Sequence, residues 1–234
     1  MTCARSRGRY DQEVGQGSWG WWAGSRPTHL THPPHQINLT AMPSSLAPSL
    51  LLSMPQLIDP NFNRTVVLLC KHREDGAFGL VVNRPLVTTG PVVVEVRTHA
   101  DAIEQTAASS DHELEVWIGG PVEPQRSWIL VGHDEDDDEE SRGQRVAPGL
   151  YLSTSPELLH RVLGPSPPAR TRLIFGYSGW GPGQLEAELE ASAWLISDVS
   201  RDLIFSTPPE RMWEAAIRRL GADPAALQMS RGVH

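Results

Sequence analysis

The chain has 234 residues, 39% hydrophobic and 21% charged, a composition that fits a globular protein and excludes a fibrous or wholly disordered one. Its two cysteines, one near the start and one at the end of an apolar run, suggest neither a disulfide framework nor a zinc site, so we expect a reducing, cytoplasmic compartment. The net charge is −8. Residues 1–41 contain four arginines and two acidic residues, a charge of +2, so residues 42–234 carry −10. This negative charge argues against direct DNA binding by residues 42–234.

The first segment of the chain differs in composition from everything after it. It is rich in Gly, Pro, His and Trp and shows no period of 2 or 3.6. We therefore expect residues 1–45 to be a leader outside the fold, either a disordered tail or an overcalled translation start with Met42 as the first residue. Residues 46–234 are expected to form one domain. The apolar stretch 46–58 is interrupted by two prolines and is too short to span a membrane, so no membrane association is expected.

Short apolar runs predict the strands of this domain. Residues 65–70 are β-branched or apolar, uninterrupted and bounded by polar residues. Asp75-Gly76 is a hairpin turn signal, so residues 78–82 are expected to pair with them. Further strands are expected at residues 115–118, 128–132, 149–152 and 172–175.

A run of seven carboxylates occupies residues 134–140. Their mutual repulsion favours an extended, solvated loop. The run lacks the alternating oxygen ligands, central glycine and final glutamate of a calcium-binding EF-hand loop. We expect no metal site in this protein.

Helices are indicated by capping residues and apolar stripes. Residues 155–164 begin with Ser-Pro-Glu and end at a glycine. Residues 184–196 place leucines, an alanine and an isoleucine on one face. A third helix starts near Thr207 and ends at Gly221, and Asp223-Pro224 opens a fourth. In the third helix, the residues expected to face the core are Trp213, Ile217 and Leu220. Because strands come first and helices gather toward the end, the pattern favours an α+β fold.

The segment 176–186 is a glycine-rich turn between a predicted strand and a predicted helix. Backbone amides at such a helix start can bind an anion. The segment matches neither a dinucleotide fingerprint nor a phosphate-binding P-loop, and Glu186 and Glu188 would repel a phosphate. We favour close packing around Trp180 as the role of these glycines, with an anion site as the alternative.

Ser178 lies in a sequence that partly matches the nucleophile elbow of hydrolases. That motif requires glycine two residues after the serine, where this chain has Trp180. A hydrolase or transferase would need Ser178, Asp59 and Glu186 to meet in one cleft. This alternative stays open at the level of the sequence.

Two predicted strands end in turn-forming and polar residues. Asn83-Arg84-Pro85 follows one strand and Gly119-Gly120-Pro121 follows another. If both ends meet at one edge, Arg84 could bind a carboxylate or phosphate while the glycines let the ligand approach the backbone. The alternative, slightly favoured, is that Arg84 pairs with Asp59 or Glu123 and holds loops together.

Taken together, these segments resemble the bacterial YqgE/AlgH family over about residues 49–232. The matching motifs, in chain order, are Ser53-Met54-Pro55, Asp59-Pro60-Asn61-Phe62, Arg64-Thr65-Val66-Val67, residues 76–85, Gly119-Gly120-Pro121-Val122 and residues 176–189. The resemblance implies a strongly twisted, partly barrelled, mostly antiparallel sheet packed against several helices. It implies no established catalytic mechanism, and some members carry a transcriptional-regulator label. The chain departs from the family before Met42, over residues 88–112 and in the acidic loop.

We therefore expect a non-catalytic protein with a binding or regulatory role, not an enzyme, that acts through these turns without a cofactor. Its partner is an unidentified protein or small molecule. The alternatives are the hydrolase or transferase near Ser178 and a direct DNA-binding transcription factor. The predicted binding residues are Asn83, Arg84, Gly119, Gly120, Gly179, Trp180 and Gly181.

Overall fold

The computed structural model describes residues 45–86, 93–97, 103–107, 115–133, 143–164 and 166–229. All of them belong to one compact unit, Thr40–His234. The predicted leader, apart from residue 45, lies outside the described residues, as do the acidic loop at 134–140 and most of the segment 88–112. In the described part of the chain, no helix is long and apolar enough to cross a membrane.

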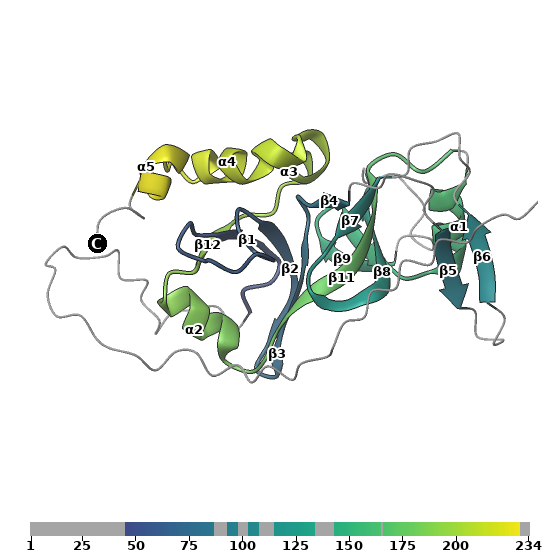
Figure 1. The fold of residues 1–234 in the computed structure, drawn as a ribbon, viewed down its shortest axis with the longest axis horizontal. Helices are drawn as coiled ribbons and strands as arrows, with labels where there is room; N and C mark the ends of the chain where they lie inside the picture. The colour runs from purple at the N-terminus through teal and green to yellow at the C-terminus, as the bar shows by residue number, and fades with distance from the viewer. Residues whose placement is uncertain are drawn as a thin grey trace, which may run out of the picture. The chain divides into compact units, whose positions relative to one another are not determined.

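Strands and helices alternate irregularly along the chain (Figure 1). The strands are β1 (Ser49–Ser53), β2 (Val66–Arg73), β3 (Gly76–Val81), β4 (Pro85–Leu86), β5 (Val93–Arg97), β6 (Ile103–Ala107), β7 (Val116–Ile118), β8 (Val122–Gly132), β9 (Gln144–Ala147), β10 (Leu150–Ser153), β11 (Thr171–Trp180) and β12 (Trp194–Ser197). The helices are α1 (Pro156–Leu163), α2 (Gln184–Glu190), α3 (Arg201–Ser206), α4 (Pro209–Arg219) and α5 (Pro224–Met229).

Ten of the described strands form one curled sheet. Its order is β12-β1-β2-β3-β11-β8-β10-β9, and β7 joins the side of β11 and pairs with β4. The pairings are antiparallel except that between β7 and β11, and β5 and β6 form a separate hairpin. The sheet bends into a half-barrel with helices packed against it (Figure 1). The predicted α+β fold with a partly barrelled, mostly antiparallel sheet is therefore confirmed.

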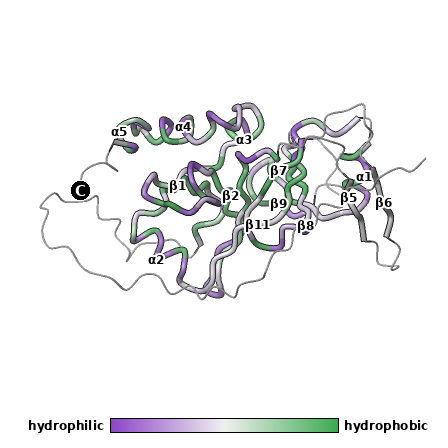
Figure 2. Tube along the Cα trace, viewed as in Figure 1, coloured by the Kyte–Doolittle hydropathy of each residue, from purple (hydrophilic) through white to green (hydrophobic). Residues whose placement is uncertain are grey.

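Strand β1, the first half of β2 and the second half of β3 are buried on both faces, so the buried stretches of β1 and β2 are continuous or nearly continuous apolar runs. Successive side chains of a strand point to opposite faces. In β1, Leu50 and Leu52 belong to one hydrophobic cluster, whereas Leu51 belongs to another on the opposite face. Figure 2 shows hydrophobic stretches around β2, and helices α4 and α5 that alternate between hydrophilic and hydrophobic residues.

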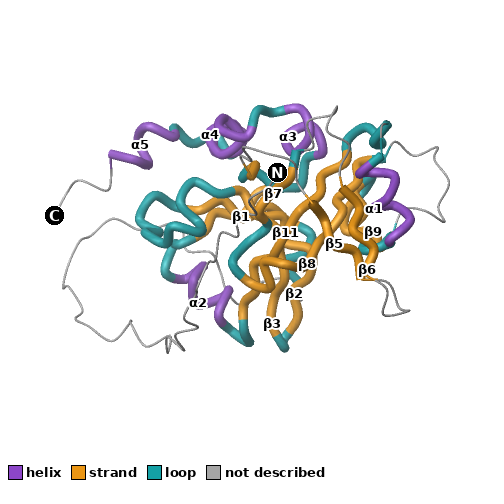
Figure 3. The backbone as a smooth tube through the Cα atoms, turned by 45° about the vertical axis from the view of Figure 1, so that its right-hand side comes forward, coloured by secondary structure: helices purple, strands orange, loops and turns teal. Residues whose placement is uncertain are grey.

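Helices cover the two faces of this part of the sheet. Helix α4 inserts Trp213 and Ile217 into the cluster that contains Leu50, and α2 inserts Leu185 and Leu189 into the cluster that contains Leu51. The two helices lie on opposite sides of β1 in both views (Figures 1 and 3). Helix α1 packs against β8 and β11 in a third cluster.

The predicted helix 184–196 is wrong in its second half. Helix α2 ends at Glu190, and after a turn at Ser192, where φ is 57°, the chain enters β12. Strand β12 pairs with β1 from Ser53↔Trp194 to Leu50↔Ser197. The free edge of β1 would otherwise leave buried backbone groups without hydrogen bonds, and this tertiary demand overrides the helical spacing of the apolar residues.

The predicted core position of Leu220 is also wrong. Trp213 and Ile217 are 1% and 0% exposed, but Leu220 is 42% exposed. Helix α4 ends at Arg219, and the chain leaves the core surface at Leu220, ahead of a left-handed Gly221. Gly221 does follow the end of the helix, as predicted, but the stripe of buried apolar residues on α4 ends at Ile217, one turn earlier than the sequence pattern predicts.

Candidate functional site

The predicted binding residue Asn83 connects two segments of the fold. Its Oδ1 accepts a hydrogen bond from the backbone N–H of Val66 at 2.8 Å, and its Nδ2 donates to the carbonyl of Arg64 at 2.9 Å. Both groups of the amide are thus used inside the domain. Asn83 fixes the entry of the chain into β2, and it fixes the backbone of Arg64.

Arg84 holds the loop before β2. Its Nη2 donates to the carbonyls of Pro60 at 2.8 Å and Asn63 at 3.3 Å. Burial lowers the pKa of the Arg84 guanidinium, and the charge of Asp59 opposes that shift. These contacts agree with the alternative in which Arg84 holds loops together. Glu123, one of the two acidic partners suggested for Arg84, instead pairs with Arg126 at 3.1 Å.

Gly119 and Gly120 allow two strands to approach closely. The Gly119 N–H donates to the carbonyl of Phe175 at 2.7 Å, and its carbonyl accepts from Val81 N–H at 2.8 Å. A Cβ atom on Gly120 would lie 2.3 Å from the carbonyl oxygen of Tyr177. The space beside this glycine is therefore filled by β11. The turn does lie beside Arg84, because Ile118 N–H donates to the Arg84 carbonyl at 2.9 Å.

The third predicted turn, Gly179-Trp180-Gly181, docks helix α2. The Trp180 indole Nε1 donates to Glu188 Oε2 at 2.9 Å, and the Gly181 N–H donates to Gln184 Oε1 at 3.0 Å. Trp180 is 7% exposed and packs in the cluster under α2. This is the close packing favoured from the sequence, and it lies on the sheet face opposite the cluster that contains Val82.

The residues considered for catalysis each have a local partner. Ser178 is 0% exposed and its hydroxyl donates to the Gly119 carbonyl at 3.1 Å. Asp59 Oδ1 accepts from the N–H of Asn61 at 2.7 Å, and Glu186 contacts His72 at 2.8 Å. In the described part of the chain, no group of three or more His, Cys, Asp or Glu residues is placed to bind a metal ion.

An open cleft lies elsewhere, between the loop that precedes β2 and the C-terminal helices. Its volume is about 290 Å³. The lining residues are Pro55, Asn63, Arg64, Trp213 and Gln228. The loop supplies the first three, α4 supplies the tryptophan and α5 the glutamine.

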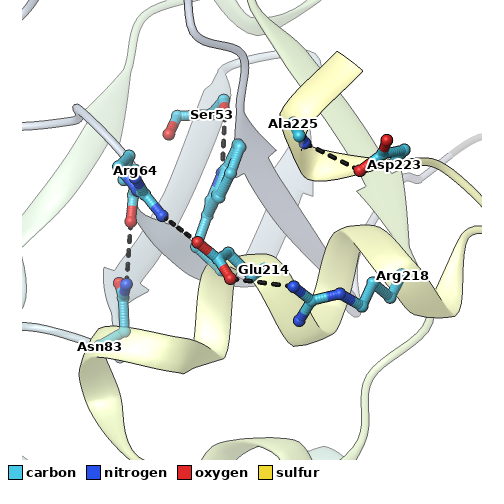
Figure 4. Close-up of polar contacts among 8 residues, drawn as sticks. Ser53, Arg64, Asn83, Glu214, Arg218, Asp223 and Ala225 are labelled. Atoms are coloured by element: carbon cyan, nitrogen blue, oxygen red, sulfur yellow. Dashed lines mark hydrogen bonds and ion pairs between the residues drawn. The ribbon is translucent and has the colours of Figure 1, made fainter. Parts of the chain in front are cut away.

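Arg64 is the central charged residue of this cleft. Its φ is 55°, a left-handed conformation that costs free energy in a residue with a side chain. The Asn83 amide holds its carbonyl, and its guanidinium lies over the Trp213 ring at 5.0 Å. Its Nη2 donates to Glu214 Oε1 at 2.6 Å (Figure 4). Strained residues of this kind concentrate at functional sites, and Arg64 lines the cleft.

Neighbouring groups fix the geometry around Arg64. Glu214 also accepts from Arg218 Nη2 at 3.0 Å, so one carboxylate joins two guanidinium groups (Figure 4). The hydrogen bond from Arg64, followed by that from Arg218, lowers the pKa of Glu214. The Trp213 indole donates to the Ser53 carbonyl at 2.9 Å, which fixes the ring on which Arg64 lies.

The sequence indicated none of this cleft as a site. Arg64 occurs in one of the family-like motifs, and Trp213 was correctly predicted to face the core, but neither was given a binding role. Their juxtaposition joins segments about 150 residues apart in the chain. The positive φ of Arg64 is a backbone property that its residue type does not suggest.

The fold and the cleft together define an α+β protein with a half-barrel sheet and an open cleft beside α4. The AlgH-like family model matches residues 50–225. A UPF0301 protein from Myxococcus xanthus is 40% identical over 190 residues, which cover 81% of this chain and 99% of the relative. A UPF0301 protein from Ruegeria pomeroyi is 37% identical over 188 residues, 80% and 98% of the two chains. The chain belongs to the AlgH-like family.

Solved structures support the same fold. The solution structure of the AlgH protein from Pseudomonas aeruginosa is 32% identical, with a TM-score of 0.59, and the match covers 83% of this chain and 98% of that one. A crystal structure of a protein from Corynebacterium diphtheriae has a TM-score of 0.55 at 21% identity, over 80% and 91% of the two chains. The second likeness concerns the fold alone.

Proposed function

We propose that this AlgH-like protein is a non-catalytic binding protein whose ligand or partner occupies the Arg64 cleft. Any regulatory effect then comes from this binding and not from contact with DNA. The charge of −10 carried by residues after 41 supports the second part, because DNA binding depends on basic residues. The burial of Ser178 supports a non-catalytic role.

The observation that carries the proposal is the conformation of Arg64. The protein holds this residue in a left-handed backbone conformation, with a side chain that is 44% exposed, at the wall of an open cleft. A structural ion pair with Glu214 alone does not require that conformation. A rigid guanidinium presented to solvent on an aromatic ring is a common arrangement for ligand recognition.

The test is a ligand screen followed by NMR on the full chain. Small carboxylates, inorganic phosphate and small amines are added, and the indole N–H signal of Trp213 is followed. We expect at least one probe to shift this signal saturably in the wild type. The shift should disappear in Arg64→Ala.

The chain offers a matched control. Arg126 also pairs with a glutamate, Glu123, and its guanidinium also lies over a tryptophan, Trp128, at 4.6 Å, but it does not line the cleft. Arg126→Ala should keep the response of the Trp213 signal. If no probe shifts the signal, or if Arg64→Ala and Arg126→Ala respond alike, the proposed function is wrong.

A further inference from the structure

We infer that the group recognised in the Arg64 cleft is a single carboxylate, bound by the edge of the Arg64 guanidinium that faces away from Glu214. This inference rests on the proposed function and specifies the chemistry of its ligand. Three features of the cleft carry it: the unused donors of Arg64, the balance of charge and the volume.

Arg64 has hydrogen-bond donors to spare. A guanidinium carries five N–H groups in a planar fork. Nη2 donates to Glu214, and within the described residues neither Nη1 nor Nε of Arg64 has an acceptor. Contact with the Trp213 ring limits rotation of the guanidinium plane. Nη2 uses one of its two N–H groups for Glu214, so its second N–H and an N–H of the neighbouring nitrogen on that side form two parallel donors that match the two oxygens of a carboxylate.

The group formed by Arg64, Arg218 and Glu214 carries one net positive charge. Arg64 and Arg218 share the single carboxylate of Glu214, at 2.6 and 3.0 Å. Asp59, on the same loop as Arg64, faces the charge of Arg84, which follows β3. A monoanion therefore neutralises the site. A phosphate dianion would bring excess negative charge close to Glu214 in a domain that is already acidic, so the site favours a carboxylate over a phosphate.

The volume of the cleft restricts the size of the ligand. At about 290 Å³ it lies at the lower end of the range of small-molecule pockets, roughly 300–1,000 Å³. Pro55 offers an apolar contact, and the amides of Asn63 and Gln228 offer further hydrogen bonds. Such a space fits a short organic acid or one acidic side chain of a partner, and the two sources share the same carboxylate chemistry.

The experiment compares matched probes in the NMR assay on the full chain. Propionate is compared with propionamide, which has the same shape without the charge, and with inorganic phosphate. A second arm uses a five-residue peptide with a central glutamate, acetylated at its N-terminus and amidated at its C-terminus, and its glutamine counterpart. We expect propionate or the glutamate peptide to shift the Trp213 signal saturably, and the amide counterparts and phosphate to leave it unchanged. The stronger arm identifies the source.

Two further variants keep the test valid if Arg64→Ala perturbs folding. Arg64→Lys retains the charge but loses the paired donors, so carboxylate affinity should fall roughly tenfold. Glu214→Gln removes the competing negative charge, so affinity should rise roughly three- to tenfold. Arg126→Ala should leave it unchanged.

The outcomes separate the two proposals. If phosphate, an amine or an amide shifts the Trp213 signal in an Arg64-dependent manner and carboxylates do not, the carboxylate inference is wrong while the proposed function stands. If Glu214→Gln weakens carboxylate binding, the recognition edge has been assigned incorrectly. If no probe acts, both proposals fall.

Discussion

Replacing Gly120 with alanine tests whether the Gly119-Gly120 turn serves strand packing or ligand approach. Gly120 has φ of 149°, outside the range that alanine adopts readily. The new Cβ would lie 2.3 Å from the oxygen and 2.4 Å from the carbonyl carbon of Tyr177, both backbone atoms. Tyr177 belongs to β11, which pairs with β3 on one side and β8 on the other, so it has little freedom to move.

The magnitude follows from two contributions. Forcing a side chain into a strained backbone region costs about 1–3 kcal/mol. Overpacking against atoms that cannot move costs about 1–3 kcal/mol more. We expect Gly120→Ala to lower the free energy of unfolding by about 4 kcal/mol, the middle of that combined range.

Gly183→Ala is the matched control. Gly183 also has a positive φ, 71°, but a Cβ there would meet no atom within 4 Å. It should therefore pay the conformational cost alone, about 1–2 kcal/mol. Urea unfolding followed by circular dichroism measures both variants, provided that the slope with denaturant stays equal to that of the wild type. If both variants lose the same free energy of unfolding, the close contact between position 120 and Tyr177 does not contribute to the cost of Gly120→Ala.

Two other predictions concern the buried Arg172 and the partly buried Cys70. Arg172 is 6% exposed and donates hydrogen bonds to the carbonyls of Val82 and Ile204. Arg172→Met removes both donors, so we expect urea titrations to show a free energy of unfolding that is lower by about 2–4 kcal/mol. Unchanged or increased stability would mean that the cost of burying the charge dominates. Burial raises the pKa of the Cys70 thiol to about 12, so in a Cys3→Ser background this thiol should react with an aromatic disulfide reagent much more slowly in the native than in the urea-unfolded protein at about pH 8.5. The folded state keeps the Cys70 proton at pH values where the unfolded state loses it. The contribution of this thiol to stability is therefore complete below about pH 8.5 and declines as the pH rises toward 12. Equal thiol reactivity in the folded and unfolded states would contradict the raised pKa of Cys70.

The sequence alone predicted the strands around the first hairpin and the character of the fold. The predicted strands 65–70 and 78–82 match β2 and β3 except for one residue each. The hairpin is confirmed, but the pairing of Arg73 with Gly76 places its turn at Glu74-Asp75, one residue before the predicted Asp75-Gly76. The Ser155 cap is confirmed by a hydrogen bond from the N–H of Leu158 at 3.2 Å. These features depend on residues close together in the chain, where local preference and tertiary packing agree.

The same local information failed where a distant segment set the structure. Residues 191–196 have the apolar spacing of a helix, but the exposed edge of β1, more than 130 residues earlier, draws part of this segment into β12. Glu188 has a role that the sequence pattern does not indicate. From the sequence it is a charge that would repel a phosphate, yet in the fold it accepts hydrogen bonds from the indoles of both Trp180 and Trp194.

The candidate site shows the division most clearly. Residue types and turn signals identified Arg84 and the glycine pairs as unusual, and the resemblance of the motifs identified the family. Only the folded chain distinguishes Arg84, whose Nη2 donates to two backbone carbonyls, from Arg64, whose Nη2 donates to Glu214 at an open cleft. The sequence does not separate the two arginines. They differ in the hydrogen-bond acceptors that tertiary packing brings close to each guanidinium, and for Arg64 the contact of α4 with the loop before β2 supplies that acceptor.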